Sequence, residues 1–168
     1  ILKSSYYNVY EKCNEIKEIS DSKVLLNIAE SYMGTKAKRI ASQLWWTFPV
    51  EANNEEKSKA ALYFHRDLDD FKFIKFFFYI SDVNAGDGEH SYVKTSHKTS
   101  FTQNIREKFR VSRFLDEKII NWYGQRNIHV LYGKKGSGFI EDTFGFHKGS
   151  KPLNNPRLLL CIVFALNN

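Results

Sequence analysis

The apolar positions of the first part of the chain recur three or four residues apart, which is the spacing of one face of a helix. They are Val24, Leu25, Ile28, Ala29, Tyr32 and Met33. The segment Ser20–Ser22 supplies N-cap oxygens ahead of this run, and Gly34 is placed to end it. The pattern predicts an amphipathic helix of about three turns that packs on a sheet.

From about Ile40 the pattern changes to short runs rich in aromatic and β-branched residues, separated by turn residues. Seven such runs cover residues 41–50, 60–68, 71–83, 90–97, 127–133, 137–147 and 157–166. Residues 84–88 and 133–138 are turns by composition. Residues 99–125 interrupt the strand pattern, and LDEKIINWYG within them predicts a short helix. The runs favour a β-sandwich or barrel with an insertion over one end.

Composition supports one folded unit. A chain of 168 residues has the usual size of a single domain, and we expect residues 1–168 to form one. The 14 Phe and 9 Tyr favour β structure. The two cysteines, Cys13 and Cys161, lie far apart and in no metal-type spacing, which argues for a reducing, cytoplasmic location. No stretch stays apolar for the roughly 18 residues of a membrane span.

The net charge of +6 raises the question of an anionic macromolecular partner. The lysines and arginines are scattered, however, and the basic cluster at residues 36–39 is short. A solvated basic surface therefore explains the charge better than a nucleic-acid interface. The pattern gives no indication of the oligomeric state.

Chemistry-bearing residues gather in the run at 60–68. In a strand, Tyr63, His65 and Asp67 would share one face, so His65 and Asp67 could hold one metal ion. H-x-D is a weak signal by itself and needs a third ligand, for which the candidates are His90, His97, His129 and His147. His147 ends a strand-like run. Ten positions later Arg157 opens an otherwise apolar strand, where an arginine needs an anionic partner.

Together, His65, Asp67, His147 and Arg157 resemble the motif of the iron(II)/2-oxoglutarate-dependent dioxygenases. More narrowly, FHRDLDDFKFIKFFFYISDV, GEHSYVKTSHK, GSGFIEDTFGFHKG and NPRLLL look like the phytanoyl-CoA dioxygenase family, over roughly Leu44 to the C-terminus. The resemblance implies a mainly β protein with flanking helices, built as a double-stranded β-helix (jelly roll, cupin-like). Members are usually longer, which leaves open that N-terminal elements are missing here.

The resemblance also implies an activity. His65, Asp67 and His147 would bind Fe(II) and form the catalytic centre, and Arg157 would pair with the distal carboxylate of 2-oxoglutarate. With O2 bound as well, a small-molecule substrate would be hydroxylated at a C–H bond while 2-oxoglutarate is decarboxylated to succinate. Halogenating relatives lack the metal-binding carboxylate, so Asp67 favours hydroxylation. No arginine lies between His147 and Arg157, which weakens a nucleic-acid version of the reaction.

Two more residues are candidates for contact with 2-oxoglutarate. Lys75 shares a strand face with Phe77, and some oxygenases anchor the cosubstrate with such a lysine; the alternative is an edge lysine that reaches solvent. The Tyr63 hydroxyl could donate to the cosubstrate, or Tyr63 could be a core aromatic. Two other functions stay open, a non-catalytic metal-binding jelly roll and a nucleic-acid-modifying oxygenase. The substrate is not indicated.

Overall fold

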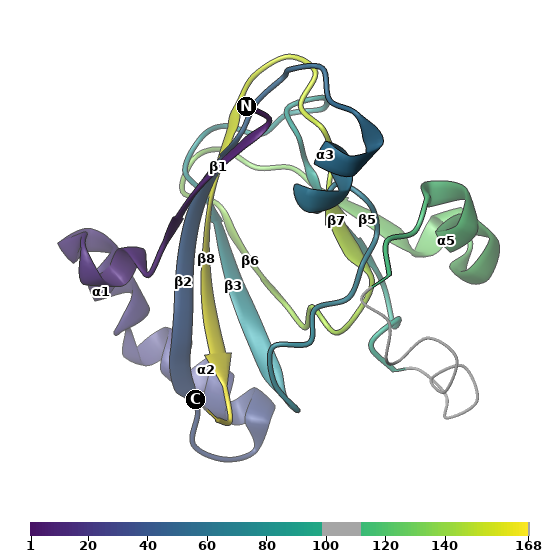
Figure 1. Ribbon diagram of the computed structural model, residues 1–168. Helices are drawn as coiled ribbons and strands as arrows, with labels where there is room; N and C mark the ends of the chain where they lie inside the picture. The colour runs from purple at the N-terminus through teal and green to yellow at the C-terminus, as the bar shows by residue number, and fades with distance from the viewer. Residues whose placement is uncertain (99–111, 168) are drawn as a thin grey trace.

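The computed structural model describes residues 1–98 and 112–167, and in them two antiparallel sheets face each other (Figure 1). The larger sheet has the strand order β1-β2-β8-β3-β6 and the smaller one the order β5-β4-β7. The strands of the larger sheet are β1 (Lys3–Tyr7), β2 (Lys38–Thr47), β8 (Arg157–Ala165), β3 (Phe73–Tyr79) and β6 (Gly138–Glu141). Those of the smaller sheet are β5 (Ile128–Leu131), β4 (His90–Val93) and β7 (His147–Gly149).

The segment that carries His65 extends the smaller sheet without forming a regular strand. The strand expected over residues 60–68 is reduced to isolated bridges of Phe64 with Phe114 and of His65 with His147. Ala61 has a φ of 60°, which interrupts extended backbone at the start of the run. Because His147 belongs to β7, the second bridge adds this segment beside β7, on the side away from β4.

With this added segment, the three strands of the smaller sheet and the segment itself face β2, β8, β3 and β6 of the larger one (Figure 1). This is the double-stranded β-helix, so the predicted fold class is confirmed. The run expected over residues 137–147 is split into β6 and β7, because a turn in which the Gly145 amide donates to the Asp142 carbonyl separates them. The chain therefore leaves the larger sheet at Glu141 and enters the smaller one at His147.

Strand alternation gives the larger sheet two different faces. Tyr7, Gln43, Cys161 and Phe77 lie opposite one another on successive strands and therefore share a face. This face looks toward the smaller sheet. The other face carries a buried apolar cluster that includes Phe76, Leu160, Ile162 and Phe164. One part of the core thus lies between this sheet and helices, while the inner face carries a second buried cluster that includes Phe77, Leu159 and Cys161 and also lines a cavity.

The predicted helix that covers the outer face is α2 (Lys23–Met33). The Ser22 hydroxyl oxygen accepts a hydrogen bond from the Val24 amide at 3.3 Å. Gly34 ends the helix with a φ of 77°, a conformation that glycine adopts without steric cost. Ala29 and Met33 are buried against the sheet. The cap, the amphipathic face and the stop signal are all confirmed.

The other helical elements flank the two sheets (Figure 1). They are η1 (Val9–Glu11), α1 (Asn14–Ser20), α3 (Asn54–Lys59), α5 (Asp116–Tyr123) and η2 (Gln125–Asn127). The expected short helix in the insertion is α5, whereas residues 99–111 of that insertion lie outside the described residues. The sequence pattern missed β1, α1 and α3. No helix within the described ranges is long and apolar enough to cross a membrane.

We expect Ile162→Ala to lower the free energy of unfolding by about 2 to 5 kcal/mol, because the Ile162 side chain is fully buried between the sheet and the helices. Ile140→Ala is the matched control, since Ile140 lies on strand β6 but is 48% exposed. It should cost less than about 1 kcal/mol. Urea denaturation measures both values, and equal losses would contradict this location of the core.

Candidate active site

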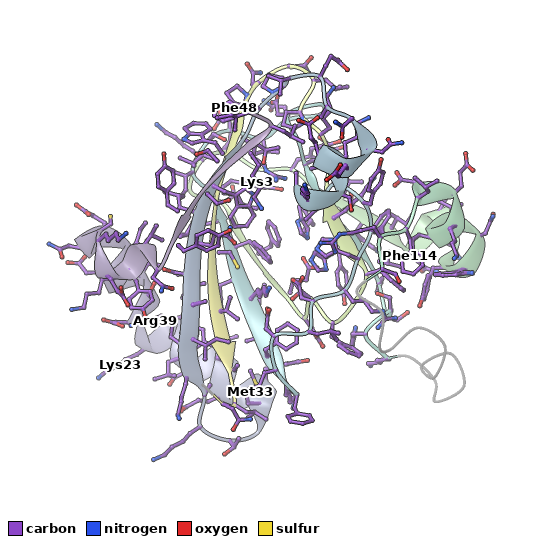
Figure 2. The ribbon with its side chains drawn as sticks, viewed as in Figure 1. Lys3, Lys23, Met33, Arg39, Phe48 and Phe114 are labelled. Carbon is purple, nitrogen blue, oxygen red and sulfur yellow. The ribbon has the colours of Figure 1, made fainter. Side chains whose placement is uncertain are left out.

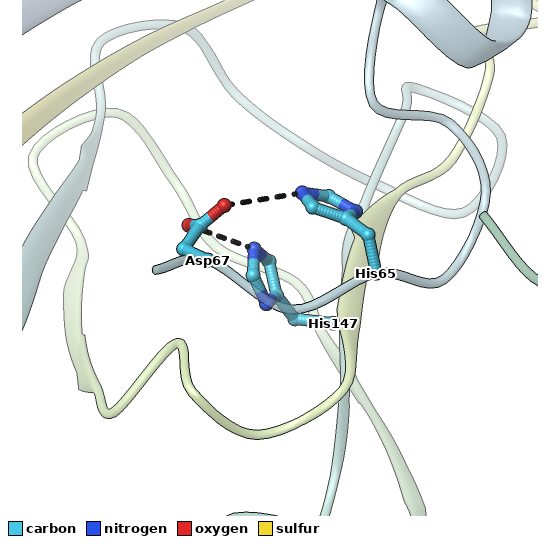
Figure 3. Close-up of side chains that lie close together, drawn as sticks. All are labelled: His65, Asp67 and His147. Carbon is cyan, nitrogen blue, oxygen red and sulfur yellow. Dashed lines mark ion pairs between the residues drawn. The ribbon is translucent and has the colours of Figure 1, made fainter. Parts of the chain in front are cut away.

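His65, Asp67 and His147 lie together on the inner side of the smaller sheet (Figure 3). The backbones of His65 and His147 exchange two hydrogen bonds of 3.0 Å, and the Asp67 amide donates to the Thr143 carbonyl at 2.9 Å. One oxygen of Asp67 lies 3.6 Å from Nε2 of His65, and the other lies 3.3 Å from Nε2 of His147. The three ligand atoms all lie within 4.8 Å of one another. The structure thus brings the predicted triad together.

Each histidine ring is oriented by a backbone carbonyl two residues earlier. Nδ1 of His65 lies 2.9 Å from the Tyr63 carbonyl oxygen, and Nδ1 of His147 lies 3.0 Å from that of Gly145. Because a carbonyl oxygen only accepts, each Nδ1 carries a proton and donates it. In the neutral ring the lone pair is then on Nε2, the atom that faces Asp67. Metal-binding histidines commonly have their second ring nitrogen fixed in this way.

The donor set therefore fits a divalent transition metal. Two imidazole nitrogens and one carboxylate suit iron(II) and leave coordination positions for other ligands. Burial, followed by the neighbouring His147, lowers the pKa of His65 well below its usual value. For His147 burial opposes protonation, but Asp67 and Glu141 outweigh it and raise the pKa. A cation bound between the rings would displace that proton, since the ligand form of histidine is neutral.

Lys75 holds the Asp67 carboxylate in place. Its Nζ lies 2.8 Å from one Asp67 oxygen and 2.6 Å from one oxygen of Asp69. Burial alone would raise the pKa of Asp67, but His147, Lys75 and His65 together hold that pKa well below its usual range. Burial likewise disfavours the charged form of Lys75, yet the two carboxylates raise its pKa. Asp67 is thus ionised and held in a fixed orientation.

Arg157 is a buried cation without an ionic partner in the described ranges. Its side chain is 2% exposed, and it donates from Nη1 to the Gly88 carbonyl and from Nη2 to the Thr47 hydroxyl at 3.3 Å. Burial lowers the pKa of Arg157 to about 10, so the group is still charged at neutral pH. A Cβ added at Gly149 would lie 2.9 Å from Nη2. The guanidinium therefore occupies space that only glycine leaves free.

The triad, Arg157 and Lys75 line one cavity of about 270 Å³. Tyr63 is not among the lining residues. Its hydroxyl donates to the side-chain oxygen of Asn54 at 3.0 Å, and its contribution to the site is the carbonyl that orients His65. A larger cavity of about 630 Å³ lies elsewhere, between α2 and residues 68–73, and contains none of the triad.

The structure adds residues that the sequence pattern did not assign to the site. Glu141 and His90 form a buried pair, with Oε2 of Glu141 2.6 Å from Nε2 of His90, and Oε1 of Glu141 lies 3.8 Å from Nδ1 of His147. The Thr47 hydroxyl accepts a hydrogen bond from Arg157, and Gly149 leaves room for the Arg157 guanidinium. Lys3 and Arg113 also line the cavity. The register of the two expected strands would have shown Thr47 opposite Arg157, whereas Lys3 could be found only if β1 had been expected.

A scan of the sequence against models of protein families finds no match, and a search among curated proteins finds none either. Solved structures do match the fold. HygX from Streptomyces hygroscopicus, in a structure with nickel and 2-oxoglutarate bound, has a TM-score of 0.69 at 16% identity. The match covers 98% of this chain and 70% of HygX.

Two further solved structures also match the fold of this chain. EctD from S. alaskensis, with 2-oxoglutarate and 5-hydroxyectoine, has a TM-score of 0.70 at 13% identity, over 95% of this chain and 55% of EctD. The epimerase SnoN, in complex with Fe3+, alpha ketoglutarate and nogalamycin RO, has a TM-score of 0.70 at 14% identity, over 97% of this chain and 63% of SnoN. At such identities the three matches establish a shared fold.

We expect the protein to bind Ni(II), a redox-stable substitute for Fe(II), and His147→Ala to lower that affinity at least about 100-fold, because it removes one of three ligands. His129→Ala is the matched control, since His129 is exposed on β5 outside the cluster. It should leave the affinity unchanged. Titration calorimetry measures both, and an unchanged affinity in the His147 variant would contradict the triad.

Proposed function

We propose that this chain is an iron(II)/2-oxoglutarate-dependent oxygenase that hydroxylates a C–H bond of a small molecule. One observation carries the proposal. Two oriented histidines, an ionised carboxylate and a buried arginine without an anionic partner in the described ranges line the same cavity. A metal site alone would not require Arg157, and an anion site alone would not require His65, Asp67 and His147.

The three ligands perform distinct tasks. With a metal bound, His65 and His147 would each present an unprotonated Nε2, because their Nδ1 atoms donate to the carbonyls of Tyr63 and Gly145. Asp67 would supply one negative charge, and Lys75 pairs with its carboxylate at 2.8 Å. Iron held by these ligands would supply the redox chemistry that couples decarboxylation of 2-oxoglutarate to oxidation of the substrate. We assign Lys75 to positioning Asp67, since both of its ion pairs are with carboxylates of the chain.

Arg157 would bind the distal carboxylate of 2-oxoglutarate. The guanidinium presents several donors in a planar fork, which matches a carboxylate better than a lysine does. Its Nε has no hydrogen-bond partner among the described residues, so it has donor capacity to spare. The absence of a side chain at Gly149 leaves room for the guanidinium, which donates hydrogen bonds to the Gly88 carbonyl and the Thr47 hydroxyl.

Residues from both ends of the chain line the cavity, since Lys3 is the first residue of β1 and Arg157 is the first residue of β8. We therefore infer that residues 1–168 act as one catalytic domain. The HygX structure has nickel and 2-oxoglutarate bound, and the SnoN structure is a complex with Fe3+ and alpha ketoglutarate. EctD has been solved with bound Fe and, separately, with 2-oxoglutarate. This supports the same pair of ligands for the present chain, which shares their fold.

We expect the iron-loaded protein to release succinate from 2-oxoglutarate under air and Asp67→Ala to lower this rate at least about 100-fold, because the carboxylate ligand is lost. Asp70→Ala is the control, since Asp70 accepts hydrogen bonds from Phe71 and Asn167 and lies outside the cavity lining. Succinate is quantified with and without a metabolite library. Equal turnover in wild type and Asp67→Ala would refute the triad, and binding without turnover would favour a metal-binding module.

We expect Gly149→Ala to raise the Kd for 2-oxoglutarate about ten-fold, because the new methyl group must displace the Arg157 guanidinium. Affinity for Ni(II) should stay within about three-fold of wild type. Lys148→Ala is the neighbouring control, since Lys148 pairs with Asp116 at 2.6 Å and does not line the cavity. Anaerobic calorimetry of the metal-loaded protein measures these values. An unchanged Kd in Gly149→Ala would contradict the assignment of Arg157.

A further inference from the structure

A second cationic group shares the inner face with Arg157. Lys3 on β1 is the register partner of Thr47 on β2, and Thr47 is the register partner of Arg157 on β8. Directly opposed residues of antiparallel strands point to the same face, so Lys3 and Arg157 lie on one face, about 10 Å apart across two strand spacings. The Lys3 ammonium lies over the Trp45 ring, 4.8 Å from its centroid. Figure 2 shows Lys3 on the side of β1 toward α3.

A third cation enters from the side of the smaller sheet. Phe114 forms a bridge with Phe64 and so lies next to the segment that carries His65 (Figure 2). Arg113 is the residue before Phe114 and therefore lies beside the same segment. The Arg113 Nε donates to the Ser58 carbonyl at 3.3 Å. Its Nη1 is buried and has no hydrogen-bond partner among the described residues. Arg113 and Lys3 both line the cavity that contains the triad.

The charges of this cavity do not balance. Its described lining contains one carboxylate, that of Asp67, and five cationic side chains: Lys3, Lys59, Lys75, Arg113 and Arg157. Asp67 and Asp69 pair with Lys75, and Glu55 pairs with Lys59 at the exposed rim. Within the described residues, Lys3 and Arg113 have no carboxylate at ion-pair distance. Burial, followed by the charge of Arg157, lowers the pKa of Lys3 to about 8.

The iron and the cosubstrate would not remove this excess. A divalent metal ion and dianionic 2-oxoglutarate cancel each other, and Arg157 is already assigned to one carboxylate of the cosubstrate. Like charges held together in a partly dry cavity raise the free energy of the folded protein unless an anion enters. The surrounding inner face is aromatic and apolar, with Trp45, Phe77 and Leu159.

We propose that Lys3 and Arg113 form the substrate-binding end of the cavity and recognise an anionic group, a carboxylate or a phosphate, on an otherwise apolar small molecule. This inference rests on the proposed function, because it reserves Arg157 for 2-oxoglutarate. It predicts that the site prefers acidic substrates and rejects amines of the same shape. The anion would bind while the apolar part of the molecule lies against the aromatic inner face.

The test uses four probes of similar shape and different charge: phenyl phosphate, phenylacetate, phenylacetamide and benzylamine. Binding to the protein loaded with Zn(II) and saturating 2-oxoglutarate is measured by ligand-observed NMR. We expect the two anions to bind at least about ten-fold tighter than the amide, with benzylamine weakest. The double variant Lys3→Gln/Arg113→Gln should lose this preference. Its Kd for 2-oxoglutarate should change less than about three-fold.

Lys134→Gln/Lys135→Gln is the matched control, because it also removes two positive charges but on an exposed turn outside the cavity. It should keep the anion preference. Equal binding of amide and anions by wild type, or a preference that survives in the Lys3 and Arg113 variant, would overturn the inference. So would a loss of 2-oxoglutarate binding in that variant, which would assign both residues to the cosubstrate. Wild type that binds neither Zn(II) nor 2-oxoglutarate would instead refute the proposed function.

Discussion

The backbone pairing of His65 with His147 is the interaction on which the rest of the site depends. The two residues lie far apart in the sequence, yet their amides and carbonyls exchange two hydrogen bonds of 3.0 Å. This pairing attaches an otherwise irregular segment to β7 and so completes the smaller sheet. It also sets the two rings side by side, with centroids 4.2 Å apart. The same backbone pairing therefore completes the smaller sheet and brings the two histidine side chains together.

The site collects buried charge that the fold alone does not need. Two imidazoles and a carboxylate are largely removed from water, and the described cavity lining holds more cations than anions. Burial of charge without a partner costs free energy. Lys75 offsets part of this cost at Asp67, whereas Arg157, Lys3 and Arg113 have no carboxylate partner within the described ranges. A bound ligand of opposite charge would offset this cost, and this is the physical basis of the proposed function.

How much the sequence predicts depends on whether the signal is local. The capped helix α2 and the strands β3 and β8 carry their own periodicity, so both their type and their position follow from the pattern. His147 and Arg157 are recognisable because a histidine ends one apolar run and an arginine opens another.

By contrast, β1 lies in a polar segment whose side chains find partners only through β2, and no local pattern marks it. Lys3, Thr47 and Gly149 acquire their roles from register and from the space around Arg157, which are long-range properties. The irregular backbone of residues 60–68 likewise follows from the left-handed φ of Ala61 and the single bridge to β7.

In the proposed function, His65, Asp67 and His147 would hold iron in the same cavity in which Arg157 would hold 2-oxoglutarate. The most direct measurement is an anaerobic titration of the iron(II)-loaded protein with 2-oxoglutarate, followed in the visible spectrum. If the cosubstrate chelates the iron, a charge-transfer band appears and saturates at one equivalent. The absence of any band in folded, iron-loaded protein would contradict binding of 2-oxoglutarate to iron in this cavity.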